Sequence, residues 1–509
     1  MTLSIGEGEI LIGLGEGPVT QRLDRSNRHG VVAGATGTGK TVTLQIMAQA
    51  FSDAGVPVFA ADVKGDLSGI AIAGAPNEKM LARAASMDLT LNPSAPPTVF
   101  WDLFGQKGHP IRTTISEMGP VLLARLLELN DVQEGVLTIV FHVADKDGLL
   151  LLDLKDLQAA LKYVADHAAD IGTLYGNVSP ATVGAIQRKL LTLQSQGADN
   201  FFGEPALKLA DIMRTDVAGR GYVNLLAADR LIQSPKLYST FLLWLLSELF
   251  EELPELGDVD KPRLVFFFDE AHLLFNDAPR PLLEKIEQVV RLIRSKGVGI
   301  YFVTQNPADI PDAVLGQLGA RIQHALRAYT PADQKGLKAA AQSFRINPSF
   351  DTAETIQGLG VGEALVSTLD AKGAPCVVQK TMIRPPASRL GPLTPEERTA
   401  LIARSPVSGL YDAAQDRASA YEVLQGRAQD ALRQSEAAED AAEAEKVRIA
   451  EEKVRAREEA RETRAAPRPR ASNRQGMAET FAKSLLRTVA SQAGREIMRG
   501  LLGGLKRGR

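Results

Sequence analysis

The sequence predicts an α/β protein built on a mostly parallel sheet that is covered by helices. Short β-branched or aromatic runs alternate with longer helical patterns from the start of the chain to about Pro386, which is typical of this class. Several of these runs end in polar residues, and a glycine-rich turn follows one of them. With 509 residues and 45% hydrophobic content, the chain is long enough to bury at least one large core.

Five runs are predicted as strands: residues 31–33, 56–61, 264–268, 300–304 and 322–326. The run 264–268 is apolar throughout, as expected of a strand buried on both faces. Ligands of parallel sheets bind at the carboxyl ends of the strands, so the polar residues that follow these runs are the first candidates for a site.

The chain is predicted to have five parts. Residues 1–110 and 201–387 form the two parts of the catalytic core, and the Leu-rich helical patterns of residues 111–200 form an insertion between them. Residues 388–467 form a connector and a charge-dense arm, predicted as a solvated helix or a disordered segment. A helix is preferred for this arm, and coiled-coil pairing is an option although apolar a and d positions are sparse.

Residues 468–509 form a basic tail with ten Lys and Arg against two Glu. Its larger apolar residues fall close to helical spacing, which predicts a basic amphipathic helix. Nucleic acid, an acidic membrane surface and a protein partner all fit such a helix.

The composition narrows the function classes. The formal net charge is −3, so a polyanion site would have to be local. The single cysteine, Cys376, cannot form an intramolecular disulfide, and the six histidines show no metal-binding spacing. No segment is apolar over a length that spans a bilayer, and the first residues do not resemble a signal peptide. We therefore expect a soluble, cytoplasmic protein.

The first chemical motif is a phosphate-binding loop that matches G-x-x-x-x-G-K-[ST] between a predicted strand and a helix predicted over 42–54. Its glycines allow the backbone N–H groups to point at phosphate oxygens, and the helix N-terminus adds partial positive charge. Lys40 is expected to reach the β- and γ-phosphates, and the Thr41 hydroxyl to bind Mg²⁺. The predicted nucleotide contacts are Gly34, Ala35, Thr36, Gly37, Thr38, Gly39, Lys40, Thr41 and Val42.

The second motif is a pair of carboxylates, Asp269 and Glu270, at the end of the run 264–268. Asp269 is expected to hold Mg²⁺, directly or through water, and Glu270 to act as the general base for the attacking water. An ordinary strand end followed by a helix cap is the alternative.

The third motif is Gln305, which follows the strand predicted over 300–304 and could orient the attacking water or sense the γ-phosphate. Transition-state charge on the phosphoryl group calls for a further cation, which a neighbouring subunit can supply. Arg294, Arg321 and Arg327 are the candidates, and spacing does not choose among them. Asp62 could contact the nucleotide site or only cap a turn.

These motifs, together with residues 28–30 and 61–67, resemble the YjgR-like bacterial ATPases of the HerA–FtsK superfamily. The resemblance extends to about Pro406 and implies a RecA-like core. It also implies that Lys40 and Thr41 contact phosphate and Mg²⁺, that Asp269 and Glu270 are the Mg²⁺ and catalytic carboxylates, and that Gln305 is the sensor. Superfamily members are commonly hexameric rings that move DNA and take an arginine from the neighbouring subunit.

The sequence departs from two superfamily members. About thirty residues precede the phosphate loop, too few for the N-terminal β-barrel of HerA, and a winged-helix module of the FtsK kind is not evident. Two functions therefore stay open: a Mg²⁺-dependent ATPase motor acting on DNA, and a nucleotide-switched assembly protein without DNA motor activity. A phosphate-loop kinase is less favoured, because Glu270 beside Asp269 suits water activation.

Overall fold

A computed structural model describes residues 6–257, 259–275 and 280–465. Its main element is a 12-stranded sheet with the order β2-β1-β12-β11-β10-β3-β9-β8-β4-β7-β5-β6. The strands are β1 Glu9–Leu14, β2 Pro18–Arg22, β3 Gly30–Ala33, β4 Val58–Asp62, β5 Thr98–Asp102, β6 His109–Pro110, β7 Val223–Ala227, β8 Leu264–Phe268, β9 Val298–Thr304, β10 Ala320–Gln323, β11 Glu363–Ser367 and β12 Gln379–Ile383.

The strands from β10 to β6 in this order are parallel, whereas β11, β12, β1 and β2 pair antiparallel at one side. This arrangement confirms the predicted α/β class with a mostly parallel sheet. In the parallel part, β3, β9, β8 and β4 are consecutive neighbours. Their carboxyl ends therefore meet at one edge, where the loops after these strands form the candidate site.

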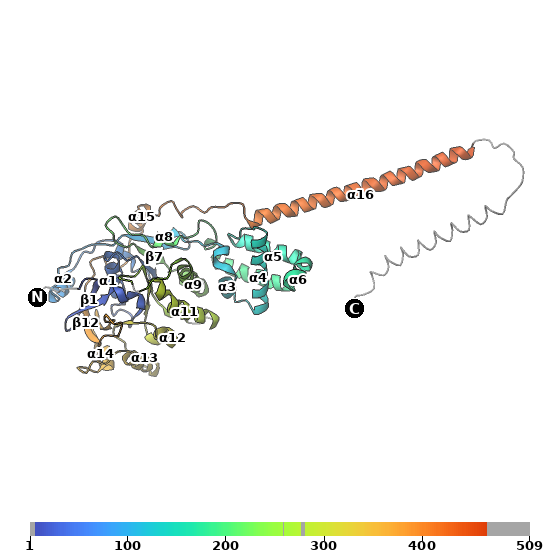
Figure 1. Cartoon of the computed structure of the whole chain (residues 1–509). Coiled ribbons are helices and arrows are strands. Elements are labelled where there is room, and N and C mark those ends of the chain that lie inside the picture. Colours follow the sequence, from blue (N-terminus) through green and yellow to red (C-terminus); the bar gives the residue numbers. More distant parts are fainter. Residues whose placement is uncertain (1–5, 258, 276–279, 466–509) are drawn as a thin grey trace, which may run out of the picture. The chain divides into compact units, whose positions relative to one another are not determined.

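Alternate residues of the strands lie on opposite faces of the sheet, and both faces are buried. Val265 and Phe267 pack on the face covered by α1 (Lys40–Asp53), while Phe266 and Phe268 pack on the face covered by α9 (Pro235–Glu252) and α11 (Arg280–Ile293). Figure 1 shows these helices against the sheet. Because β8 is covered on both faces, its continuous apolar run follows directly from its place in the sheet.

A group of helices, α3 to α7, lies between β6 and β7 in the sequence. The helices are α3 Ile115–Leu126, α4 Asp131–Lys146, α5 Leu154–Asp166, α6 Ala168–Tyr175 and α7 Pro180–Ser195. Thr114, Asn130 and Asp153 start α3, α4 and α5 with capping boxes, which satisfy the first free amides of each helix. Figure 1 shows α3 to α6 gathered at one end of the body.

The shorter helices fill the loops of the core. They are α2 Glu78–Ser86, α8 Leu209–Ile212, α10 His272–Phe275, α12 Asp312–Leu315, α13 Pro331–Gln342, α14 Thr352–Gly358 and α15 Pro395–Ala403. Apolar residues of α13 and α14 form a small separate cluster with Ala325 and Leu326.

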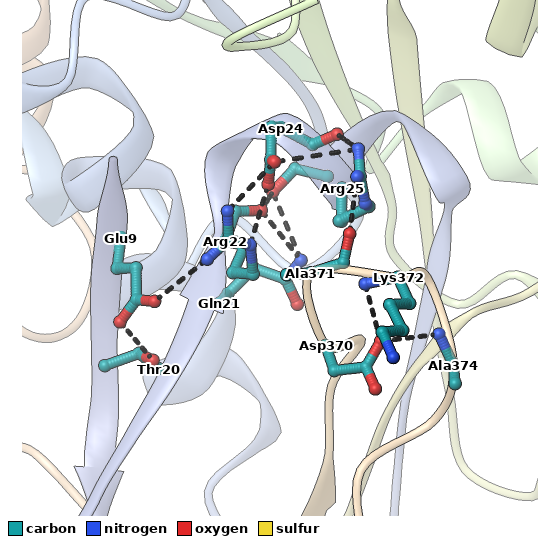
Figure 2. Close-up of polar contacts among 11 residues, drawn as sticks. Glu9, Thr20, Gln21, Arg22, Asp24, Arg25, Asp370, Ala371, Lys372 and Ala374 are labelled. Atoms are coloured by element: carbon teal, nitrogen blue, oxygen red, sulfur yellow. Dashed lines mark hydrogen bonds and ion pairs between the residues drawn. The ribbon is translucent and has the colours of Figure 1, made fainter. Parts of the chain in front are cut away.

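The antiparallel side of the sheet is tied to the segment between β2 and β3 by polar contacts (Figure 2). The Arg22 guanidinium makes two hydrogen bonds of 3.0 Å to the Asp24 carboxylate. Arg25 donates from Nη2 to the Ala371 carbonyl oxygen at 2.6 Å, in the loop between β11 and β12. Asp370 folds this loop by accepting from the amides of residues 372 and 374. The contacts fasten the loop at the amino edge of the parallel strands, opposite the candidate site.

The charged arm forms one helix, α16 (Ala420–Ala465). Its first turn is anchored to α5, because the buried Asp156 carboxylate accepts from the Ser419 hydroxyl at 2.5 Å and Lys155 pairs with Glu422 at 3.2 Å. Every described side chain from Arg427 to Arg461 is exposed. The chain divides into two compact units after Ala428, so most of α16 belongs to the second. The predicted basic tail lies outside the described residues.

Several predicted boundaries were wrong by a few residues. The strand predicted over 322–326 is β10, which starts at Ala320 and ends at Gln323, so Arg321 lies inside it and Arg327 lies well beyond its end. The strand predicted over 56–61 begins at Val58, and the helix predicted over 42–54 begins at Lys40. Among the helices of the described ranges, we find none with both the length and the apolar character needed to cross a bilayer.

The buried His29 links the sheet to α11 and leads to a prediction about pH. Its Nε2 lies 2.8 Å from the Val290 carbonyl oxygen, and its Nδ1 accepts from the Ile300 amide at 3.0 Å, so the neutral ring is fully bonded. Burial lowers the pKa of His29 to about 4. The neutral ring therefore stabilises the fold above pH 6.5, and this stabilisation, up to about 3 kcal/mol, is lost as the pH falls toward 4.

The measurement is the free energy of unfolding in denaturant at several pH values between 7.5 and 4.5, for the wild type and His29→Asn. Asparagine cannot titrate, and the backbone at this position, with φ 58° and ψ 171°, is strained for either side chain, so the strain is common to both proteins. We expect the difference between the two proteins to shrink as the pH falls. Parallel curves would show that His29 does not carry this pH dependence.

Candidate functional site

The glycine-rich loop connects β3 to α1 at the carboxyl edge of the sheet. Its three glycines have positive φ, 152° at Gly34, 77° at Gly37 and 118° at Gly39, which side chains rarely adopt. A Cβ atom on Gly34 would also lie 2.5 Å from the Cβ atom of His324. The loop therefore needs glycine for its backbone path, and it leads directly into the N-terminus of α1.

Lys40 is the first residue of α1 and is only 8% exposed. Its Nζ donates to the carbonyl oxygens of Gly34 at 2.7 Å and Ala35 at 3.1 Å, so the ammonium lies within the loop. Burial lowers the pKa of Lys40. Neutral carbonyl oxygens compensate a buried ammonium less well than an anion does, so the loop holds a cation that is suited to a phosphate.

Thr41 points toward the loop that follows β4. Its hydroxyl donates to Asp66 Oδ2 at 3.4 Å, and Asp66 Oδ1 is buried without a hydrogen-bond partner among the described residues. Asp62 folds this loop, because its Oδ1 accepts from the amides of Gly65 at 2.8 Å and Leu67 at 3.5 Å. Burial and the charge of Asp66 raise the pKa of Asp62 to about 6. Asp62 therefore caps a turn that carries Lys64 and Asp66 to the site.

The two carboxylates at the end of β8 are held by a sharp turn. Glu270 has a φ of 49°, and its amide donates to Asp269 Oδ1 at 2.9 Å. The Ala271 amide then donates to the Val303 carbonyl oxygen at 2.8 Å, which joins the turn to β9. Burial and the neighbouring charge of Glu270 raise the pKa of Asp269 to about 7.

Glu270 is surrounded by three polar side chains from separate loops. Lys64 Nζ lies 2.5 Å from Oε1, while Gln305 Nε2 and His272 Nδ1 lie 3.5 and 3.3 Å from Oε2. Burial acts to raise the pKa of Glu270, but the hydrogen bond and charge of Lys64 hold it below its ordinary value. The carboxylate is thus ionised and, with 5% exposure, almost fully enclosed.

Gln305 also faces a cavity of about 390 Å³ beside the glycine-rich loop. Of the candidate arginines, Arg327 contributes to its wall, together with Ala35 of the loop. Arg321 lies in register with Val31 in mid-sheet and donates to the Leu315 carbonyl oxygen at 3.2 Å. Arg294 precedes β9, at the opposite edge of the sheet. Within one chain, the structure brings only Arg327 of these three to the cavity.

Lys64, His272 and His324 were not predicted as parts of this site. His324 supports the loop from below: its ring nitrogens lie 2.9 Å from the Thr43 hydroxyl on α1 and 2.9 Å from the Glu363 carbonyl oxygen on β11. Burial lowers the pKa of His324 to about 4, so the ring is neutral. For Lys64 and His324, the signal available in the sequence was that each is a polar residue shortly after a strand.

The donor atoms at this edge fit a hard divalent cation bound together with a polyphosphate. The described side chains contain no group of three or more His, Cys, Asp or Glu that could hold a metal alone. Mg²⁺ in such sites uses one or two protein oxygens, and water and phosphate oxygens complete its shell. The Thr41 hydroxyl and the Asp269 carboxylate are oxygen donors of that kind. The site combines a phosphate cradle, oxygen donors for a cation and an ionised carboxylate that can accept a proton.

Comparisons with known proteins bear on the family and the fold. The family described as Helicase HerA-like C-terminal matches residues 8–509. A probable helicase of Methanocaldococcus jannaschii, MJECL08, is 30% identical over 125 residues, which are 24% of this chain and only 22% of that relative. VirB4 of Thermoanaerobacter pseudethanolicus has a similar fold, with a TM-score of 0.50 at 15% identity over 75% of this chain and 98% of that chain. The plasmid coupling protein TrwB, in complex with a non-hydrolysable GTP analogue, gives a TM-score of 0.48 at 13% identity over 76% of this chain and 93% of that chain.

Proposed function

The chain belongs to the Helicase HerA-like C-terminal family and is a P-loop ATPase, and from this premise we propose that it is a Mg²⁺-dependent motor that acts on DNA. The observation that carries the proposal is that the phosphate loop, which encloses the Lys40 ammonium, and the turn that holds the ionised Glu270 lie at the same edge of the sheet. A phosphate cradle beside an enclosed carboxylate suits the transfer of a phosphoryl group to water.

In this proposal the residues from Gly34 to Val42 bind the triphosphate through their amides and the Lys40 ammonium. Thr41 and Asp269 hold Mg²⁺, which neutralises charge on the β- and γ-phosphates when bound. Glu270 accepts a proton from the attacking water, and Gln305 orients that water or senses the γ-phosphate. The short Lys64 contact that keeps Glu270 ionised supports its assignment as the base.

The proposed assembly is a ring of identical chains, with six as the expected number. Arg327 or Arg321 would supply the cation that stabilises charge on the γ-phosphoryl group, in its own chain or in the neighbouring one. Arg327 is favoured in its own chain because it lines the cavity beside Gln305. Coiled-coil pairing of α16 between chains remains a prediction of this arrangement.

Steady-state ATP hydrolysis with and without DNA tests the motor. We expect double-stranded or single-stranded DNA to raise the rate about tenfold, which corresponds to about 1.4 kcal/mol off the barrier. The stimulation should fade as salt rises, because contacts to DNA phosphates release counterions. Nucleotide alone, in the same salt series, is the control for effects of salt on the enzyme itself.

A rate that DNA does not change would favour the second candidate, a nucleotide-switched assembly protein. The observation behind this candidate is α16, a long charged helix whose described side chains are exposed beyond Arg427 and which is suited to a protein partner. The net charge of −3 also provides no general attraction for DNA.

A further inference from the structure

Lys64 is a cation of the site whose part in the proposed hydrolysis is so far only to keep Glu270 ionised. It lies in the loop after β4, its side chain is 48% exposed, and its Nζ is 2.5 Å from Glu270 Oε1. The partner is 206 residues away in the sequence, so the contact depends on the pairing of β4 with β8. The Lys64 side chain is half-exposed, and the negative charge of the enclosed Glu270 carboxylate holds its ammonium in place.

The loop that carries Lys64 contacts both halves of the site. Its backbone is fixed by the buried Asp62 and by Gly65, which has a φ of 78°. Two residues beyond Lys64, the Asp66 carboxylate accepts from Thr41 on the phosphate-loop side. The loop therefore contacts the phosphate-loop side through Asp66 and the end of β8 through Lys64.

Both lysines of the site have partners that a phosphate can replace. Lys40 binds two neutral carbonyl oxygens, and Lys64 binds a carboxylate with a single charge. Lys40 lies in the loop after β3 and Lys64 in the loop after β4, so both lysines lie at the carboxyl edge of the parallel strands. Two ammonium groups at one edge favour the binding of an anion there, and a terminal phosphate carries more charge than a carboxylate.

We propose that Lys64 is a second ligand of the terminal phosphate, contributed by the same chain, and that it exchanges Glu270 for the γ-phosphate of a bound nucleoside triphosphate. The exchange frees Glu270 Oε1 for the attacking water only when a triphosphate is present. A bound nucleoside diphosphate has no γ-phosphate, so Lys64 stays paired with Glu270. The inference rests on the proposed function, because it assumes that a triphosphate binds in the phosphate loop.

The test is the affinity of the full-length chain for Mg²⁺·AMP-PNP relative to Mg²⁺·ADP, measured by calorimetry. We expect Lys64→Met to lower this ratio about tenfold with little change in ADP affinity, and Lys64→Arg to keep it. Lys107→Met is the matched control, since Lys107 is 49% exposed and also forms a short ion pair, with Asp229 at 2.6 Å. Misfolding would weaken the binding of both nucleotides together and would leave the ratio of their affinities unchanged.

A second background separates phosphate binding from a simpler effect. Removing Lys64 leaves the Glu270 charge unpaired, and that charge alone could repel a triphosphate. We therefore measure the same ratio with Lys64→Met in Glu270→Gln, where the charge is gone. If Lys64→Met lowers the affinity ratio both in the protein that keeps Glu270 and in Glu270→Gln, the inference is supported. If the ratio falls only in the protein that keeps Glu270, or does not fall in either, the inference is overturned. Failure of the wild type to bind either nucleotide would instead overturn the proposed function.

Discussion

Glu270→Gln is expected to slow ATP hydrolysis about 10² to 10⁴-fold while ATP remains bound. General base catalysis by a positioned carboxylate contributes a factor of this size, and an amide cannot accept the proton. The side chain keeps its shape, and its carbonyl oxygen can still accept from the Lys64 ammonium that now contacts Oε1. Single-turnover hydrolysis and equilibrium binding of ATP, measured on the same preparation, separate rate from affinity.

Glu204→Gln is the control for this substitution. Glu204 is also largely enclosed, with 18% of its side chain exposed, and it pairs with Arg417 at 2.6 Å in the connector before α16. We expect this variant to hydrolyse ATP at the wild-type rate. A Glu270→Gln protein that turns over within a few fold of the wild type would remove Glu270 from the role of base, and attention would move to Asp269.

The fold class could be predicted because the central strands are buried on both faces. The run 264–268 is apolar throughout, and β8 has these same bounds. The predicted strand over 322–326 was misplaced because Ala325 and Leu326 are apolar and buried although they lie beyond the strand, where they pack in a separate cluster with α13 and α14. An apolar residue indicates burial, but it does not say which element buries it.

The antiparallel side of the sheet was not predicted. Its strands β1 and β12 pair through contacts such as Leu14 with Met382, which lie at opposite ends of the core in the sequence. Strand β12 also contains Lys380 and Thr381, which weaken its apolar pattern. Such strands are specified by long-range pairing rather than by local preference.

The candidate site likewise contains some residues that could be predicted from the sequence and others that could not. Lys40 and Thr41 could be singled out because the phosphate loop is contiguous in sequence, and Asp269 and Glu270 because they end a strand. Lys64 and His324 could not be assigned because each acts on a residue far away in the chain: Lys64 on Glu270, and His324 on Thr43. The roles of the predicted residues remain predictions, and substitution at Lys40 is the most direct test of them.

Lys40→Ala is expected to weaken nucleotide binding at least about 100-fold and to reduce hydrolysis to background. Hydrogen bonds from a charged donor contribute about 1.5 to 3 kcal/mol each, so the loss of two to phosphate oxygens amounts to about 3 kcal/mol or more. The alanine also removes a buried stem beneath the loop, since Lys40 is only 8% exposed. Fluorescent nucleotide binding and steady-state hydrolysis provide the two measurements.

Lys40→Met distinguishes the charge from the packing, because methionine restores an unbranched stem without an ammonium. If the charge is what matters, both variants lose binding to the same extent while their thermal unfolding differs, with the methionine variant closer to the wild type. If Lys40→Met binds ATP like the wild type, the lysine supports the loop only by filling space. The phosphate would then be held by the loop amides and by Lys64, whose 2.5 Å contact with Glu270 places a second ammonium at the same edge of the sheet.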